Sequence, residues 1–198
     1  MDGALLPLAG FAVAMYITPG PNNAMLASSG ANFGLRASVP HMLGIAAGFA
    51  LMLVLVSAGL GSVVFAWPAL LPVMRWTGAA WMLWIAWKIA TAAPPGEGGR
   101  QAVLGFFGAA SFQWINPKAW LIAVGVASEF TRPDAPLAQQ LARIAVVFLA
   151  VSIPCMLPWV LLGHGARRLL HSPARLRRFN IAMAALLVLS LIPVLLEN

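Results

Sequence analysis

Two short stretches of this chain carry residue types that could bind a small polar molecule. Their prolines lack a backbone N–H and fix φ, so each stretch should interrupt a helix. A helix that restarts after such an interruption has free N–H groups and a positive dipole end, which suit a carboxylate. The carboxamide side chains could bind an amino group or satisfy the interrupted backbone. The candidate binding residues are Thr18, Pro19, Gly20, Pro21, Asn22 and Asn23 in the first stretch (residues 18–23), and Gln113, Asn116, Pro117 and Lys118 in the second stretch (residues 113–118).

Lys118 is the one ionisable residue that the hydropathy pattern places well inside an apolar segment. A charge near the centre of a bilayer is costly and is usually retained for function with a partner. No carboxylate of the sequence falls well inside such a segment, although Glu129 lies at the end of one. Three roles for Lys118 stay open: it meets an anionic group of a bound molecule, it bonds to carbonyls freed at the other stretch, or it extends to the membrane interface.

The composition indicates a membrane protein. The chain has 198 residues, of which 61% are hydrophobic and 9% charged, with a mean hydropathy of +0.87, whereas ordinary soluble domains are about 25% charged. The net charge of +7 is attributed to membrane orientation and not to nucleic acid, because no basic surface helix or aromatic RNA platform accompanies it. Cys155 alone cannot form an internal disulfide, and the histidines lack metal-ligand spacing, so neither a metal nor another cofactor is expected.

Apolar runs of roughly the length that a membrane-spanning helix needs, about 20 residues, follow one another along the chain. The predicted fold class is therefore all-α: a polytopic membrane protein with six transmembrane helices in a single domain, residues 1–198. The first run follows an acidic residue where a signal peptide needs basic ones, so it is kept as part of the mature fold. The predicted spans are residues 4–33, 39–65, 69–91, 103–129, 137–162 and 179–195.

The lysines and arginines of the loops predict the orientation, because cytoplasmic loops are enriched in them. Six spans place most of these residues on one side and leave Arg75, Arg132 and Arg143 on the other. Both termini are therefore predicted to be periplasmic. The side predicted to be cytoplasmic carries Arg36, Lys88, Arg100, Arg167, Arg168, Arg175, Arg177 and Arg178.

The two stretches occupy matching positions in two halves of the chain, about residues 1–93 and 101–198. Each half begins with a span, helix 1 or helix 4, that is broken at its proline motif. Three spans per half is an odd number, so the second half enters the membrane from the opposite face, which is the inverted 3+3 repeat common in secondary transporters. Backbone groups freed at membrane depth are tolerated only inside the protein or along a wet cavity. The breaks should therefore face each other, although prolines that merely kink their helices are the simpler alternative.

Residues 11–48, with the run TPGPN, resemble the N-terminal signature of the LysE/RhtB family of amino-acid exporters. Residues 105–120, GFFGAASFQWINPKAW, resemble its second signature, F-x-x-Q-x-x-N-P-K, of which the part Q-x-x-N-P-K is present at residues 113–118. The resemblance implies a transporter and not an enzyme: an exporter in the bacterial inner membrane that moves amino acids or their derivatives out of the cell, driven by an ion gradient, expected to be of protons. It carries the family's motif onto Thr18, Pro19, Gly20, Pro21 and Asn22, and onto Gln113, Asn116, Pro117 and Lys118.

The acidic residues all lie in predicted loops or at the ends of predicted spans. This favours a neutral amino acid such as threonine, homoserine or leucine, because a pocket for lysine or arginine should offer a carboxylate. A membrane structural or lipid-binding protein without transport activity, and an exporter of another small solute, are the alternatives. An enzyme is disfavoured, since no catalytic set of residues can be assembled at membrane depth. Membrane lipid is an expected partner, and a monomer and a homodimer are equally allowed.

Three further sets of residues have open roles. His41 and His164, near predicted inner ends of spans, could take part in proton coupling. Trp114 and Trp120 flank the second stretch and either line a cavity or pack. The pairs Gly30/Gly34 and Gly44/Gly48 predict closely packed helices.

Overall fold

The computed structural model describes residues 5–67, 69–92, 104–169 and 172–192. Every regular element in these ranges is helical, which confirms the predicted all-α class, while the six-span inverted repeat remains a prediction. The elements are α1 (Leu5–Ile17), α2 (Pro21–Phe33), α3 (Leu35–Leu55), a π-helical turn η2 (Val56–Leu60), α4 (Gly61–Ala66), α5 (Leu70–Ala90), α6 (Phe106–Phe112), a 3-10 turn η3 (Gln113–Ile115), α7 (Pro117–Phe130), α8 (Leu137–Leu169) and α9 (Pro173–Leu189).

Two described helical stretches, Leu35–Val64 and Leu137–Ala166, are long and apolar enough to cross a membrane by length and composition. Leu5–Ile17 is apolar but shorter. Helix α8 continues past the predicted end of its span, to Leu169. Helix α9 begins earlier than predicted: Pro173 occupies its first turn, and Ser172 caps it by accepting a hydrogen bond from the Arg175 backbone N–H.

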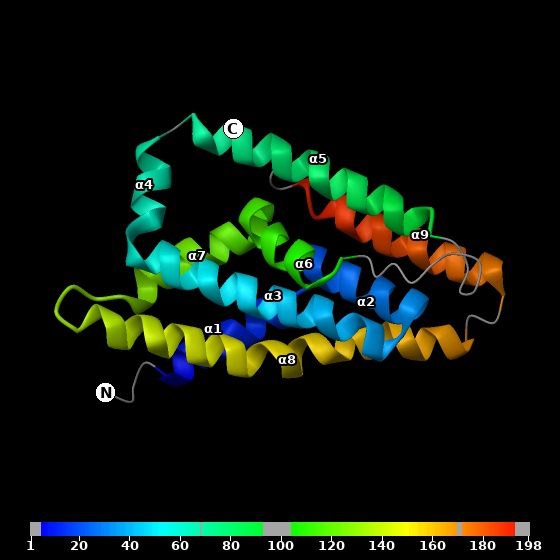
Figure 1. The fold of residues 1–198 in the computed structure, drawn as a ribbon, viewed down its shortest axis with the longest axis horizontal. Coiled ribbons are helices and arrows are strands. Elements are labelled where there is room, and N and C mark those ends of the chain that lie inside the picture. The colour runs from blue at the N-terminus through cyan, green and yellow to red at the C-terminus, as the bar shows by residue number, and fades with distance from the viewer. Residues whose placement is uncertain (1–4, 68, 93–103, 170–171, 193–198) are drawn as a thin grey trace.

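Helix α2 lies at the centre of the bundle. It packs against α8, α9 and α3, and Pro21 and residues 23–32 are buried. Helices α3 and α8 run side by side along one flank, whereas α5 and α9 pair along the other (Figure 1). Between α2 and α3 the chain turns at Gly34, whose φ of 84° is readily adopted only by glycine. Helix α2, which has 13 residues, is therefore a short helix buried inside the protein.

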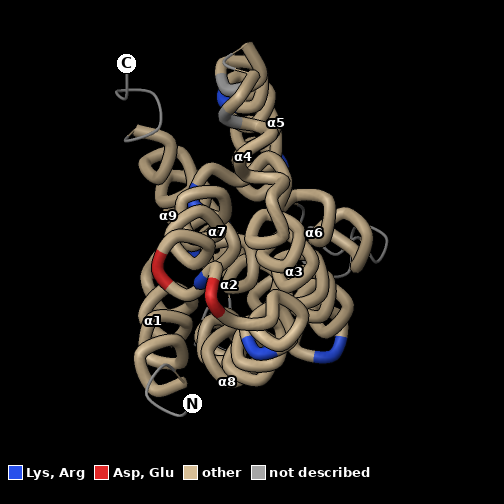
Figure 2. The backbone as a smooth tube through the Cα atoms, turned by 90° about the vertical axis from the view of Figure 1, so that its left-hand side faces the viewer, with Lys and Arg blue, Asp and Glu red and all other residues tan. Residues whose placement is uncertain are grey.

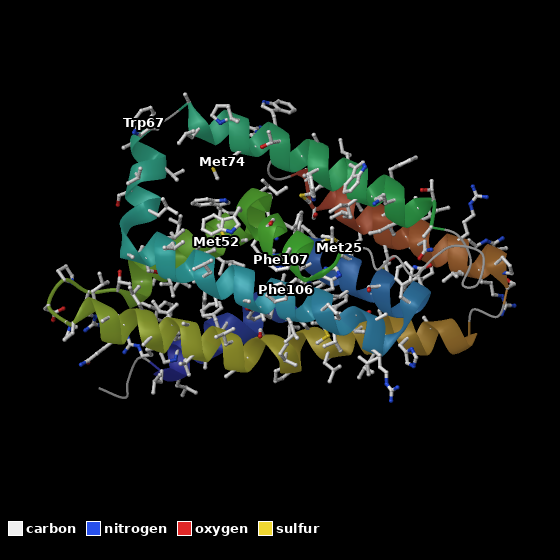
Figure 3. The ribbon with its side chains drawn as sticks, in the orientation of Figure 1. Met25, Met52, Trp67, Met74, Phe106 and Phe107 are labelled. Atoms are coloured by element: carbon white, nitrogen blue, oxygen red, sulfur yellow. The ribbon has the colours of Figure 1, made fainter. Side chains whose placement is uncertain are left out.

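Close backbone approach and apolar side chains both hold this core together. A Cβ on Gly163 of α8 would lie 1.9 Å from the Ala27 carbonyl oxygen of α2, so these helices touch through their backbones. Gly44 and Gly48 of α3 make the same kind of contact with α6. Met25 and Met52 are buried in the bundle, whereas Trp67, at the corner where α4 ends, is exposed (Figure 3).

Charged residues are sparse, and several of them lie toward the two ends of the bundle. Seen from the end where α7 leads into α8, the acidic residues of the described part, Glu129 and Asp134, lie at that end (Figure 2). The start of α3, the end of α5 and the start of α9 lie at the other end (Figure 1), which we call the basic end. It carries Arg36, Lys88, Arg175, Arg177 and Arg178.

Candidate functional site

The chain between α1 and α2 consists of Thr18, Pro19 and Gly20, with extended backbone at Gly20. Pro21 stands in the first turn of α2, where the missing N–H costs nothing. The Asn23 Nδ2 donates to the backbone carbonyls of Tyr16, at 2.8 Å, and Thr18, at 3.0 Å. One carboxamide therefore satisfies two of the carbonyls left open where α1 ends.

The second stretch has a comparable construction. Gln113 begins the 3-10 turn, Asn116 is the N-cap of α7, and Pro117 follows in its first turn. The Asn116 Oδ1 accepts a hydrogen bond from the Lys118 backbone N–H at 3.1 Å. The N-terminus of α7 is thus capped by the Asn116 side chain.

Side chains from the two stretches bond directly to each other. The Asn22 Nδ2 donates to the Gln113 Oε1 at 2.9 Å, and the Gln113 Nε2 donates back to the Asn22 Oδ1 at 3.2 Å. The Lys118 ammonium donates to the Thr18 carbonyl at 2.8 Å and approaches the Pro19 carbonyl at 3.5 Å. Of the three roles left open for Lys118, this structure shows the bond to freed carbonyls of the other stretch.

A pocket of about 370 Å³, counted with its open mouth, lies where the stretches meet. Of the predicted residues, it is lined by Gly20, Pro21, Asn22, Asn23, Gln113, Asn116 and Lys118, whereas Thr18, Pro19 and Pro117 adjoin it without lining it. Its other lining residues are Met15, Tyr16, Phe49, Ala119 and Ile122, which sequence reasoning missed.

The missed residues form the apolar part of the wall. Tyr16 and Phe49 contact each other and Phe148 of α8, with ring centroids 5.8 to 6.0 Å apart. Ala119 and Ile122 lie three residues apart on one face of α7, a spacing visible in the sequence once the start of that helix is known. No local signal marks Phe49, which reaches the pocket by the packing of α3.

The electrostatics of the pocket are those of one cation among neutral amides. Lys118 is the charged residue in the lining, and no acidic side chain is part of it. The described residues contain no group of three histidine, cysteine or acidic side chains able to hold a metal. The site therefore offers a positive charge, carboxamide donors and acceptors, and an apolar wall, which together suit a small molecule with an anionic group and a neutral side chain.

The two tryptophans beside the second stretch pack against each other and not into the pocket. Their ring centroids are 6.4 Å apart, and the Trp120 Nε1 donates to the Trp114 carbonyl at 2.8 Å. Neither residue is part of the pocket lining. Packing is thus the role that the structure gives them.

Comparisons with known proteins agree on one family. The family model described as LysE type translocator matches residues 13–196. The cysteine/O-acetylserine efflux protein of Escherichia coli (strain K12) is 34% identical over 174 residues, 87% of each chain. The protein of the same name from Salmonella typhimurium (strain LT2) is 32% identical over 173 residues, again 87% of each chain. No solved structure matches the chain.

Proposed function

Because the chain belongs to the LysE type translocator family of membrane transporters, we propose that it exports small neutral amino acids or their derivatives from the bacterial cell. The two stretches form the proposed binding site. The main support for this proposal is that the two stretches, although far apart in sequence, bond to each other beside one pocket. Asn22 bonds to Gln113, and Lys118 bonds to the Thr18 carbonyl.

In the proposed complex the substrate carboxylate binds the Lys118 ammonium in place of the Thr18 carbonyl. This exchange replaces one hydrogen bond to a charged group by a stronger bond between opposite charges. The Thr18 and Pro19 carbonyls that Lys118 releases, together with the Asn22 Oδ1, become acceptors for the substrate α-amino group. The substrate thus takes over bonds that the empty protein makes with itself.

The remaining wall selects the side chain. Met15, Phe49 and Ile122 suit a short apolar or weakly polar group, and no acidic residue of the lining could neutralise a lysine or arginine side chain. Cysteine and O-acetylserine, for which the two relatives are named, fit this class, as do threonine, homoserine and leucine. A small neutral amino acid is therefore the proposed substrate.

The proposed orientation of the exporter in the membrane follows from the distribution of its lysines and arginines. We place residues 1–198 in the bacterial inner membrane as one domain of six spans in two inverted halves, with the basic end cytoplasmic and both termini periplasmic. Export is driven by an ion gradient, proposed to be of protons. A second copy of the chain is an optional partner.

Transport by purified protein in liposomes tests the proposal. Vesicles are preloaded with radiolabelled cysteine kept reduced, O-acetylserine, threonine, homoserine, leucine or lysine, and release is measured with and without a pH gradient. We expect release of at least one neutral amino acid, faster with the gradient, and no release of lysine. Release of none of them, from protein that remains folded, would favour a structural or lipid-binding role.

A further inference from the structure

A second set of buried polar side chains lies toward the basic end, away from the pocket. Asn32 of α2 and Asn180 of α9 form a reciprocal pair, with Nδ2 to Oδ1 distances of 2.8 and 3.0 Å. The Asn32 Nδ2 also donates to the Ser28 carbonyl at 2.8 Å. Asn32 is ten residues after Asn22, so the two amide pairs are separated by about 15 Å along α2.

Serine hydroxyls extend this set from α2 to α3. The Ser29 and Ser38 hydroxyls are 2.8 Å apart, and the Ser38 Oγ donates to the Gly34 carbonyl at 2.9 Å. We call the six buried residues the polar layer: Ser28, Ser29, Asn32, Ser38, His41 and Asn180. On the α8 side of α2, a Cβ on Gly30 would lie 3.1 Å from the His164 backbone nitrogen, so the helices around the layer are closely packed.

His41 is the exception within the polar layer, because it has no hydrogen bond there. Its side chain is fully buried, and neither Nδ1 nor Nε2 has a partner in the described part of the chain. A neutral imidazole carries one donor and one acceptor, and burying both without partners is unfavourable. Structural packing alone would be served better by an apolar residue such as the adjacent Met42, so the imidazole calls for another explanation.

The elements packed against α3 supply few groups that could set the charge of His41. Helices α2 and α6 and the turns η2 and η3 carry no titratable side chain, and the acidic group on α7, Glu129, lies at the opposite end of the bundle. His164 of α8 is near the layer, and its Nδ1 is also buried without a partner in the described residues. The charged and titratable residues of α3, α7 and α8 are Arg36, Lys118, Glu129, Arg143, Cys155, His164, Arg167 and Arg168.

We propose that His41 is the side chain that binds the coupling proton of the exporter, and that the polar layer opens when it does so. The inference rests on the proposed transport function. With the layer closed, the buried His41 side chain has no hydrogen-bond partner among the described residues, which disfavours the charged imidazolium. A proton that arrives from the periplasmic side by way of the pocket converts His41 to an imidazolium, which parting of α2, α3 and α9 exposes to water. His41 then releases that proton to the cytoplasm, so the proton moves inward while the substrate moves outward. Protonation therefore favours the open conformation, as linkage requires.

The amide and hydroxyl side chains of the polar layer suit a region that opens to water. Amide and hydroxyl pairs that bond to one another when closed can bond to water when open, so both states satisfy the same groups. Leucine side chains at these positions would favour the closed state alone. The layer would thus line the route from the cytoplasm to the pocket.

The test compares two activities of the same His41→Gln protein in liposomes. Exchange of labelled for unlabelled cysteine needs the site but no gradient, whereas uphill cysteine accumulation driven by a pH gradient needs coupling. We expect His41→Gln to exchange at close to the wild-type rate and to lose uphill accumulation by at least about tenfold, within the usual range of coupling between sites. Its exchange rate should also lose the pH dependence of the wild type. His164→Gln is the matched control and should keep both activities.

Each contrary result has a distinct meaning. Uphill accumulation retained by His41→Gln, or lost in His164→Gln alone, would overturn the role of His41 and leave the proposed transport function intact. Absence of exchange by the wild-type protein with every neutral amino acid tested would overturn the transport function and this inference with it. Should His41→Gln fail to fold, His41→Met, matched in size to its neighbour Met42, is used in the same two assays.

Discussion

Replacing Lys118 by methionine removes the charge from the pocket and keeps the length of the side chain. In this structure its ammonium is bonded to the Thr18 carbonyl at 2.8 Å, and in the proposed complex it binds the substrate carboxylate. A hydrogen bond to a charged group contributes about 1.5–3 kcal/mol, which corresponds to roughly a 10- to 150-fold change in binding. Lys118 is only partly buried, so solvent screening places the expected loss in the lower part of this range, about 10- to 30-fold.

The assay is the efflux of labelled cysteine from liposomes over a range of internal concentrations. Lys88→Met is the matched control, because it removes the same charge from an apolar helix at the basic end, where the Lys88 ammonium lies 4.4 Å from the Trp84 ring centroid. Its efflux should stay within about twofold of wild type, as for most surface substitutions. Equal efflux by the two folded variants would show that the Lys118 charge does not bind the substrate.

Two more predictions concern packing and the amide pair. Gly163→Ala should destabilise the protein by about 1–3 kcal/mol, because its Cβ would lie 1.9 Å from the Ala27 carbonyl oxygen. The control Gly165→Ala has open space at its Cβ and should be neutral or slightly stabilising. Thermal unfolding in detergent measures both, and equal melting temperatures would contradict the contact. Asn22→Leu should cost about 1–3 kcal/mol by leaving the Gln113 Oε1 unsatisfied. Adding Gln113→Leu should restore much of the stability but not the efflux; a double variant with wild-type efflux would show that the pair is not part of the site.

The helical class and the residues that meet at the pocket were largely accessible from the sequence, because both depend on local chemistry. Composition and hydropathy require helices, and proline stands in the first turn of α2 and α7, where its geometry is favourable. Paired motifs in two halves predicted that the two stretches face each other. The sequence also allowed a bond from Lys118 to freed carbonyls, but as one of three alternatives.

The features of the site that the sequence did not predict depend on long-range packing. Phe49 enters the pocket wall and His41 is fully buried because of how α3 lies against its neighbours, which no periodicity encodes. The pair between Asn32 and Asn180 joins residues 148 positions apart with no motif at either. The start of α9 had a local signal, the serine cap and proline at residues 172 and 173, which the surrounding basic residues obscured.

Binding of the substrate carboxylate by Lys118 can be measured by comparing the affinities of cysteine and cysteinamide. The two molecules differ in charge at the carboxyl position and little in size. Competition binding to wild-type protein should favour cysteine by at least about tenfold, the equivalent of one charge-assisted bond, and Lys118→Met should bind the two equally. A Lys118→Met protein that keeps the wild-type preference would show that the carboxylate binds elsewhere and would contradict the account.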